Sequence, residues 1–388
     1  MTGPAPRFGM VAGEASSDLI ASLMLVGLKD RWPALKAVGI GGPRMQAQGF
    51  EAWWPSSKLS IFGYVDALKN LRELLSIRRQ LGNRLLEHKP SAFIGIDAPD
   101  FNFGLEKRLR TAGIKTIHFV CPSIWAWRPE RVETIRASAD HVLCLFPFEP
   151  ELLRGHGIAA TYVGHPLADE IPMQVSQAAA RKVLAGHDVP DPGPVSGGAL
   201  VALLPGSRKS EIEHIAAPML EAAAIMQRER PGLHFVLPAA PGMRPLIEPL
   251  LARHPGLKLS LLDGLSHKAL AACDITVVAS GTATLEAALF GRPMVVCYRV
   301  GRLNAWRMRG KNLLPWVSLP NVLAREFLVP ELIQEQCTAE NIAREGLAWL
   351  ADPARIASVQ ARFAQQHQML RCNTARTAAD AIAQIISA

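Results

Sequence analysis

The strongest constraint on the fold is a repeated alternation of short apolar runs with longer stretches of helical periodicity. Strands that read as nearly continuous apolar runs are buried on both faces, as in parallel sheets covered by helices. The runs form two series, at residues 8–13, 36–41, 92–97, 115–120 and 141–146, and at residues 200–205, 234–238, 258–262, 274–280 and 294–298. Two such series predict an α/β protein with two doubly wound, Rossmann-like parallel-sheet domains.

The length of 388 residues also favours two domains, because single cores stop growing near roughly 250–300 residues. We place the first domain at residues 1–166 and the second at 167–365. Residues 366–388 are expected to form a C-terminal helix that packs back on the first domain. Ligands of open α/β sheets bind outside the carboxyl ends of the strands. We therefore expect the carboxyl ends of the strands in the two domains to face one another across a cleft.

The net charge of +8 and the pI near 9.4 favour an anionic partner, such as a phosphorylated metabolite, anionic lipid headgroups or nucleic acid. Nucleic acid is disfavoured, because only three Tyr are present and the basic residues are scattered. The six cysteines include no CxxC pair, so we expect reduced, buried thiols and neither disulfides nor a metal site. We see no signal peptide and no apolar stretch of membrane-spanning length.

Two acids follow the third apolar run in the segment GIDAPDFN, residues 95–102. Asp97 lies at the carboxyl end of the expected strand, and Asp100 and Asn102 follow Pro99. This position places Asp97 at the lip of the expected cleft.

The first apolar run leads into Glu14, Ser16 and Ser17. The dinucleotide fingerprint GxGxxG is missing here, and in GIGGPRM the third glycine is replaced by Arg44, so nicotinamide binding is weakly supported. Glu14 is either an acceptor for a sugar hydroxyl or a first-turn helix acid.

A loop of anion-binding type follows the first strand of the second domain. Gly206, Ser207 and Arg208 lie between a strand and a helix, where Ser207 can cap the helix and Arg208 can pair with a phosphate. The Walker pattern is absent. The alternative is an ordinary capped helix with a solvent-exposed arginine.

A second loop repeats this pattern at Ser280, Gly281 and Thr282, with Glu286 about one turn into the next helix. Small residues let a phosphate approach the backbone amides, and Glu286 can accept both hydroxyls of a ribose. Together the two loops favour a nucleotide diphosphate. Asn321, in SLPNVLA, is either a ligand contact or an asparagine that closes a turn.

Residues 66–89 read as a basic amphipathic helix behind an apolar, glycine-containing segment, LSIFGYV at 59–65. Such a pair can rest on an anionic membrane. From the pattern alone, a helix that packs on the sheet with a solvated face is the better reading. Trp125 and Trp127 lie past a strand end and share one side if their segment is extended.

These segments together resemble the lipid-A-disaccharide synthase family of inverting glycosyltransferases. The resemblance rests on GEASSD, GGPRM, GIDAPDFN, PSIWAWR, GHPLAD, LLPGSR, SGTATLE, SLPN and the tail RCN, in order over nearly the whole chain. Where the family has Gly in GEASGD, this chain has Ser17.

The resemblance implies a GT-B fold and transfer of 2,3-diacylglucosamine from UDP to 2,3-diacylglucosamine 1-phosphate, with inversion and without metal or cofactor. It implies a peripheral protein on the cytoplasmic face of the inner membrane; a homo-oligomer is compatible with it. By the family motif Asp97 is the general base. Glu14, Ser16, Ser17, Asp100 and Asn102 are then expected to bind the sugar substrate, and Gly206 to Arg208, Ser280 to Thr282, Glu286 and Asn321 to bind the nucleotide.

Acylated substrates stay in the bilayer unless the enzyme reaches it, at about 0.8 kcal/mol per buried CH₂. With such substrates, membrane docking through Ile61, Phe62, Val65, Leu68 and Arg72 becomes the favoured interpretation. The rivals are another GT-B enzyme acting on a soluble UDP-N-acetylglucosamine, such as a 2-epimerase, and a non-catalytic nucleotide- or lipid-binding protein.

Overall fold

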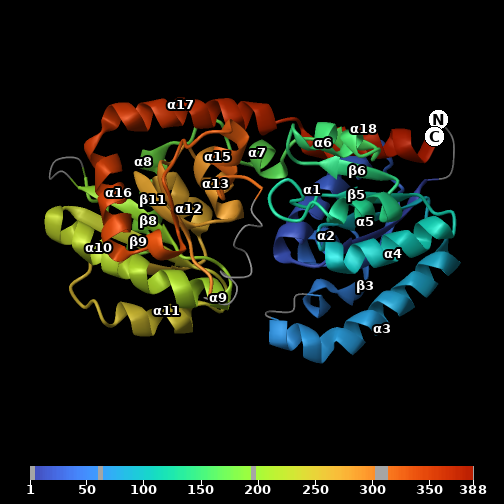
Figure 1. Cartoon of the computed structure of the whole chain (residues 1–388), viewed down its shortest axis with the longest axis horizontal. Coiled ribbons are helices and arrows are strands. Elements are labelled where there is room, and N and C mark those ends of the chain that lie inside the picture. The colour runs from blue at the N-terminus through green and yellow to red at the C-terminus, as the bar shows by residue number, and fades with distance from the viewer. Residues whose placement is uncertain (1–4, 60–63, 194–197, 302–312, 388) are drawn as a thin grey trace. The chain divides into compact units, whose positions relative to one another are not determined.

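A computed structural model describes residues 5–59, 64–193, 198–301 and 313–387; within 64–70 it describes the backbone alone. The chain divides into two compact units, residues 1–170 with 370–388, and residues 171–369. The sequence had suggested breaks after residues 166 and 365. Each unit is an α/β domain around one parallel sheet (Figure 1).

The first unit contains a seven-stranded sheet in the order β3-β2-β1-β4-β5-β6-β7. All its neighbouring strands are parallel. The strands are β1 (Arg7–Ala12), β2 (Lys36–Gly41), β3 (Glu51–Pro55), β4 (Ala92–Ile96), β5 (Thr116–Phe119), β6 (His141–Cys144) and β7 (Ala160–Tyr162). The helices are α1 (Ala15–Arg31), α2 (Pro43–Ala47), α3 (Tyr64–His88), α4 (Pro99–Thr111), α5 (Arg131–Ser138), α6 (Glu149–Gly155), α7 (Pro166–Glu170) and α18 (Thr374–Ser387).

The C-terminal helix α18 completes the core of this unit. Its buried Ala378 and Ile382 belong to the same apolar cluster as Met24 and Leu28 of α1. At the surface Arg31 of α1 pairs with Asp380 of α18 at 2.6 Å. The last helix therefore packs on α1 within the first unit, although the other unit, residues 171–369, lies between the two helices in sequence.

The second unit contains a six-stranded parallel sheet in the order β10-β9-β8-β11-β12-β13. The strands are β8 (Ala199–Leu204), β9 (Leu233–Ala239), β10 (Leu259–Asp263), β11 (Ile275–Ala279), β12 (Met294–Tyr298) and β13 (Glu331–Ile333). The helices are α8 (Gln177–Ala185), α9 (Lys209–Glu211), α10 (Ala217–Glu229), α11 (Arg244–Leu251), α12 (Ser266–Ala272), α13 (Thr282–Leu289), α15 (Leu319–Ala324), α16 (Ala339–Ala351) and α17 (Pro353–Leu370).

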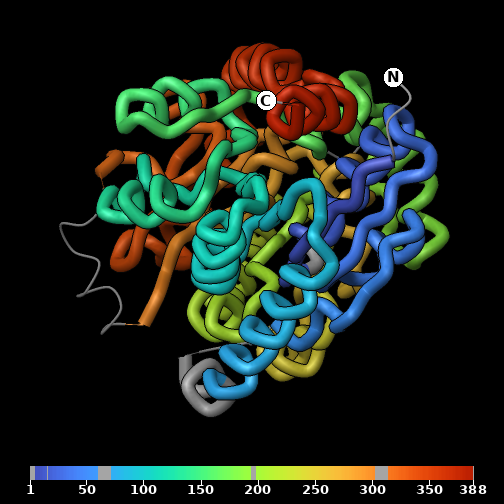
Figure 2. The backbone as a smooth tube through the Cα atoms, turned by 90° about the vertical axis from the view of Figure 1, so that its right-hand side faces the viewer, coloured from blue at the N-terminus to red at the C-terminus, as the bar shows by residue number. Residues whose placement is uncertain are grey.

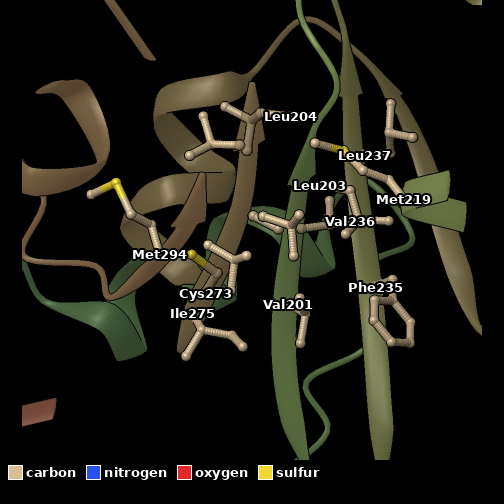
Figure 3. Packing of buried hydrophobic residues seen from close by; sticks show 14 of the residues in the cluster. Val201, Leu203, Leu204, Met219, Phe235, Val236, Leu237, Cys273, Ile275 and Met294 are labelled. Atoms are coloured by element: carbon tan, nitrogen blue, oxygen red, sulfur yellow. The ribbon is translucent and has the colours of Figure 1, made fainter. Parts of the chain in front are cut away.

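The core of the second unit forms because the expected apolar runs are buried on both faces. Every residue of β8 and β11 is buried. Figure 3 shows side chains of these two strands near those of β9, of β12, of helix α10 and of Cys273 after helix α12: Val201, Leu203, Ile275, Phe235, Leu237, Met294, Met219 and Cys273. Such burial is worth about 25 cal/mol per Å² of apolar surface, which is why ten continuous runs could specify two sheets.

Candidate functional site

The site predicted in the first unit lies where the strand order of the sheet reverses. Strands β1 and β4 are parallel neighbours, with Ala12 opposite Ile96. From β1 the chain proceeds to one edge through β2, and from β4 to the other through β5. A Cβ on Gly13 would lie 3.6 Å from the Cβ of Ala98. The structure thus brings the loop of Glu14 beside the loop of Asp97, at a topological switch point where α/β sheets bind ligands.

The Asp97 turn has an unusual backbone. Asp97 and Ala98 have φ values of 53° and 43°, a left-handed conformation that few residues other than glycine adopt. Two hydrogen bonds hold the turn: the Asp97 N–H donates to the Phe119 carbonyl at 2.9 Å, and the Asn102 Nδ2 donates to the Asp97 carbonyl at 2.7 Å. The Asp97 side chain begins at the end of β4 and is half-buried.

The other two residues of this motif differ in exposure. Asp100 is exposed and pairs with Arg131 at 2.6 Å. Asn102 is fully buried, and its amide is bound to the Asp97 turn. This burial argues against the predicted contact of Asn102 with substrate and indicates that it supports the turn.

Glu14 and Ser17 close the N-terminus of α1. The Ser17 Oγ accepts from the Glu14 N–H at 2.9 Å and donates to the Glu14 carbonyl at 3.0 Å, in a capping box. Ser17 is buried and acts in the cap, which argues against its predicted contact with the sugar substrate. Glu14 and Ser16 are exposed, and in this cap the Glu14 side chain also accepts from the backbone N–H of Ser17.

Asp18 has a structural role that no sequence pattern predicted. Its carboxylate accepts hydrogen bonds from the backbone N–H groups of Gly42, Arg44 and Met45 at 2.9, 3.0 and 3.1 Å. These groups form the start of α2, so the GGPRM loop already holds an anion from within the chain. This arrangement weighs further against nucleotide phosphate binding there. Its partners lie 24–27 residues away, so no local pattern could have shown it.

The two anion loops predicted in the second unit also meet at a strand-order reversal. Strands β8 and β11 are parallel neighbours, with Val278 opposite Leu204. The chain continues from β8 through β9 to one edge and from β11 through β12 to the other. The loops that follow Leu204 and Ala279 therefore emerge at the same edge of the sheet.

In the first of these loops the carboxylate of Glu211 accepts hydrogen bonds from the backbone amides. The Glu211 Oε2 accepts from the N–H groups of Ser207 at 2.8 Å and Arg208 at 3.1 Å. The residue that caps α9 is Arg208, and the expectation that Ser207 caps it is wrong, because Ser207 precedes the cap. The exposed Arg208 guanidinium lies 3.8 Å from the same Glu211 carboxylate. The guanidinium and the two backbone amides therefore form one anion-binding group.

The second loop presents Gly281 and Thr282 at the surface, with Gly281 as the cap of α13. The Ser280 hydroxyl donates to the Val317 carbonyl at 2.8 Å, and this hydrogen bond anchors the start of the loop to residue 317. Glu286, on the same helix, is half-buried, and its carboxylate lies 3.6 Å from the His267 Nε2. A ribose at Glu286 would therefore also approach His267.

The side chain of Asn321 is used within the chain, which argues against its predicted contact with a nucleotide and favours the alternative of an asparagine that closes a turn. It is fully buried. Its Nδ2 donates to the Val329 carbonyl and to Glu331 at 3.0 and 2.8 Å, and its Oδ1 accepts from the N–H groups of Leu328 and Val329. Because all four hydrogen-bonding positions are used inside the loop, none remains for a ligand.

The two tryptophans do not share one side, because their segment forms a turn and is not extended. Trp125 packs edge-on against Phe148 and donates its indole N–H to Glu149 at 3.0 Å. Trp127 is exposed beneath the guanidinium of Arg128. Burial raises the pKa of Glu149 to about 8, while donors including the Phe146 N–H and the Trp125 indole oppose this rise.

Of the predicted membrane residues, Val65, Leu68 and Arg72 lie in the first half of α3. Ile61 and Phe62 are outside the described residues, and for Val65 and Leu68 only the backbone is described. Arg72 is exposed. Both views place α3 at the lower edge of the first unit (Figures 1 and 2).

Exposure changes along α3. Leu71 and Leu75 are 47% and 45% exposed, whereas Leu81 and Leu85 are fully buried in the core. At Leu71 and Leu75 the helix therefore shows apolar side chains to solvent, and its end packs on the sheet.

Searches for two further features apply only to the part of the chain that the structure describes. In residues 5–59, 64–193, 198–301 and 313–387, no cluster of His, Cys, Asp and Glu side chains is arranged to bind a metal. In the same residues no helix combines the length and apolar character that crossing a bilayer requires.

Comparison with solved structures supports the fold. A UDP-N-acetylglucosamine 2-epimerase from Neisseria meningitidis, bound to UDP-N-acetylglucosamine, has a TM-score of 0.65 and 12% identity, covering 97% of this chain and 100% of that one. A calicheamicin glycosyltransferase has a TM-score of 0.59 and 14% identity, covering 99% of both chains. The fold is therefore of the GT-B type that glycosyltransferases and epimerases share.

Sequence comparisons identify the family. The model of lipid-A-disaccharide synthetase matches residues 9–385. A lipid-A-disaccharide synthase of Albidiferax ferrireducens is 53% identical over 387 residues, covering 98% of this chain and 97% of that protein. One from Burkholderia thailandensis is 51% identical over 386 residues, covering 99% and 97%. The chain belongs to the lipid-A-disaccharide synthetase family.

Proposed function

We propose that this chain joins UDP-2,3-diacylglucosamine to 2,3-diacylglucosamine 1-phosphate and releases the β-1,6-linked disaccharide 1-phosphate and UDP. Family membership makes it a glycosyltransferase of lipid A synthesis with a UDP-sugar donor and a sugar-phosphate acceptor. The observation that carries the assignment of residues is the position of the predicted loops. In each sheet they lie at the strand-order reversal, where the fold binds ligands.

Asp97 is the proposed general base. An inverting transfer needs one group to take the proton of the acceptor hydroxyl as its oxygen attacks the anomeric carbon and the bond to UDP breaks. Asp97 is half-buried at the end of a strand and its backbone is fixed on both sides, which supports a defined carboxylate position. The exposed Glu14 of the neighbouring loop is the alternative base.

The loops of the second unit are the proposed donor site. The leaving UDP gains negative charge, and amide N–H groups with Arg208 can stabilise it. Because Glu211 holds the amides of Ser207 and Arg208, a diphosphate at these amides must displace its carboxylate. Gly281 and Thr282 supply a second group of exposed backbone atoms, and Glu286 is the proposed ribose acceptor.

Docking on the cytoplasmic face of the inner membrane is the proposed route to the acylated substrates. The exposed Leu71 and Leu75 support it, because they continue the predicted apolar surface of Val65 and Leu68 along α3. Arg72 lies between them in sequence and can contact anionic headgroups. We expect charged substitutions at Leu71 and Leu75 to lower the bound fraction on anionic vesicles, with UDP affinity unchanged.

The experiment that tests this function measures UDP release and disaccharide formation from both diacylated substrates in detergent micelles. We expect product from the wild type and a loss of roughly 10²–10⁴-fold in kcat for Asp97→Asn, with UDP affinity retained. Glu133→Gln is the matched control from the same unit, since Glu133 is exposed on α5 and ion-paired with Arg136. It should keep nearly full activity.

Two outcomes would change the proposal. Full activity of Asp97→Asn would move the base to Glu14, which Glu14→Gln then tests. A folded, UDP-binding wild type that forms no disaccharide, yet consumes soluble UDP-N-acetylglucosamine, would favour the 2-epimerase activity of its fold relatives.

A further inference from the structure

Beneath the Asp97 turn lies a group of three buried polar side chains that the proposed reaction does not use. Asn102 and Glu106 are on α4, one turn apart, and His118 is on β5; all three are fully buried. The His118 Nδ1 lies 2.7 Å from the Glu106 Oε1. We call Asn102, Glu106 and His118 the buried polar cluster.

The sheet leaves room for this cluster by placing a glycine between its members. Gly95 on β4 is the register partner of His118 on β5. A Cβ on Gly95 would lie 2.1 Å from the Glu106 Oε1 and 3.0 Å from the Asn102 Cβ. Any side chain at position 95 would thus collide with the cluster, so the glycine that opens the GIDAPDFN motif has a steric reason.

The cluster is costly for the protein to keep. The Asn102 Oδ1, the Glu106 Oε2 and the His118 Nε2 are buried and find no hydrogen-bond partner among the residues that the structure describes. Burial also raises the pKa of Glu106, an effect that the nearby His118 partly offsets. Apolar residues of similar volume would avoid these costs, which indicates that the polar groups serve something other than stability.

The cluster connects directly to the strained turn. Asn102 donates its Nδ2 hydrogen to the Asp97 carbonyl at 2.7 Å, while its own N–H donates to the Ala98 carbonyl at 3.0 Å. The hydrogen bond between Glu106 and His118 fixes the next turn of α4 against β5. Two successive left-handed residues persist only where their surroundings determine the conformation, and these contacts do so.

We propose that Asn102, Glu106 and His118 are positioning residues that hold the carboxylate of Asp97 in its catalytic orientation. They do not touch substrate; they act through the Asp97 turn. The inference rests on the proposed role of Asp97 as the base. It adds three buried residues to those on which the action of this base depends.

The test compares Asn102→Ala with Leu109→Ala in the micelle assay. Leu109 is also fully buried on α4 but packs in an apolar cluster that excludes the three residues. We expect Asn102→Ala to lower kcat roughly 10–100-fold, as small misplacements of a catalytic group do, with KM and UDP affinity within about two-fold of wild type. Leu109→Ala should lower the Tm at least as much and keep kcat.

A conservative pair at position 106 provides the second readout. Glu106→Gln retains an oxygen for the His118 N–H and should keep most of kcat, whereas Glu106→Leu should lose as much as Asn102→Ala. Equal kcat losses in Asn102→Ala and Leu109→Ala, a rise of KM in proportion to the loss, or no difference between Gln and Leu at position 106 would each overturn the proposal.

Failure of this inference can be told from failure of the proposed function. If Asp97→Asn abolishes turnover while Asn102→Ala is nearly as active as wild type, the base stands and the positioning role fails. If Asp97→Asn is fully active, both fail together.

Discussion

The β4–α4 junction of the first unit and the β8–α9 junction of the second occupy equivalent places in their sheets. Each follows a central strand at the point where the strand order reverses. Each also turns through a backbone conformation of positive φ. The first does so with Asp97 and Ala98, at 53° and 43°, and the second with Gly206, at 119°.

The difference fits the groups that the two turns present in the proposed function. There the second junction offers backbone amides to an anion, so the turn itself can be a glycine, which reaches this conformation at low cost. The first junction there presents a carboxylate from the turn, and glycine has none. A left-handed residue other than glycine costs about 1–2 kcal/mol, so the first junction needs buried support that the second does not.

Replacing Gly206 by Ala should have the largest effect, because the second junction has no comparable support. The new Cβ would lie 2.3 Å from the Glu211 Oε2 and 2.5 Å from its Cβ. We expect UDP affinity, measured by calorimetry, to fall at least about tenfold, and the free energy of unfolding to fall by roughly 1–3 kcal/mol.

The matched control for this change is Gly264→Ala in the same unit. Gly264 has a φ of 68°, with no atom within 4 Å of the added Cβ among the described residues. It should show backbone strain and unchanged UDP affinity. An equal loss of UDP affinity in both variants would show general damage to the unit.

A third junction, from β6 to α6, shows a carboxylate turned inward. Glu149 binds the Phe146 N–H and the Trp125 indole, and burial raises its pKa to about 8. Because the folded pKa lies above the unfolded value, folding takes up a proton between them. Stability is highest below about pH 4.5 for this group and falls as the pH rises towards 8, by up to about 1.4 kcal/mol per pH unit.

Unfolding of wild type and Glu149→Gln by urea at pH 5.5, 6.5 and 7.5 measures this effect. The wild type should lose stability relative to the variant as the pH rises, and other titrating groups, such as the buried His165, cancel in the difference. A difference that is constant over this range would mean that Glu149 is ionised throughout, held so by its two N–H donors.

Most of the fold could be predicted because its strands are central and apolar. The ten predicted runs correspond to strands β1, β2, β4, β5, β6, β8, β9, β10, β11 and β12. The strands that were not predicted, β3, β7 and β13, are all at sheet edges, whereas β10, also an edge strand, was predicted from its run of five residues. Edge strands are half-covered, and β7 and β13 have only three residues each, so they leave no continuous apolar run.

The positions of candidate site residues could be predicted only where they depend on a residue's own strand end. Asp97 follows β4 directly and Gly206 lies two residues after β8, so topology places them. Asn321 was ambiguous because a buried amide and a ligand-binding amide have the same local sequence. Glu106 lies four residues after Asn102 on an expected helix, so a shared face was foreseeable, but its pairing with His118 depends on strand register, which the sequence does not reveal.

The carboxylate of Glu211 offers a smaller test of the second junction. It accepts two N–H groups that a diphosphate needs, so its charge competes with the ligand. Glu211→Gln keeps an accepting oxygen and removes the charge. At about 1 kcal/mol for such a pair near water, we expect UDP to bind roughly five-fold more tightly. The control is Glu213→Gln, because Glu213 is exposed and lies two residues after Glu211; its UDP affinity should be unchanged. Weaker UDP binding to Glu211→Gln would show that the charge of Glu211 organises the loop instead.

The smallest expected effect is that of Ala98→Gly, which makes the first junction resemble the second. Glycine adopts a φ of 43° without the steric cost of a Cβ, but it loses more backbone entropy on folding, by about 0.5–1 kcal/mol. The free energy of unfolding should therefore rise by no more than about 1 kcal/mol. If the strain at Ala98 serves only to turn the chain, kcat should not change. If the strain fixes the Asp97 carboxylate, kcat should fall a few-fold while stability rises.

Arg325→Gly is the control, because Arg325 is exposed and has a φ of 55° at the end of α15 in the second unit. It should gain similar stability with unchanged kcat. A fall in kcat at Ala98 alone would show that the first junction uses its strain, and equal behaviour of the two variants would show that the two junctions differ in composition but not in mechanism.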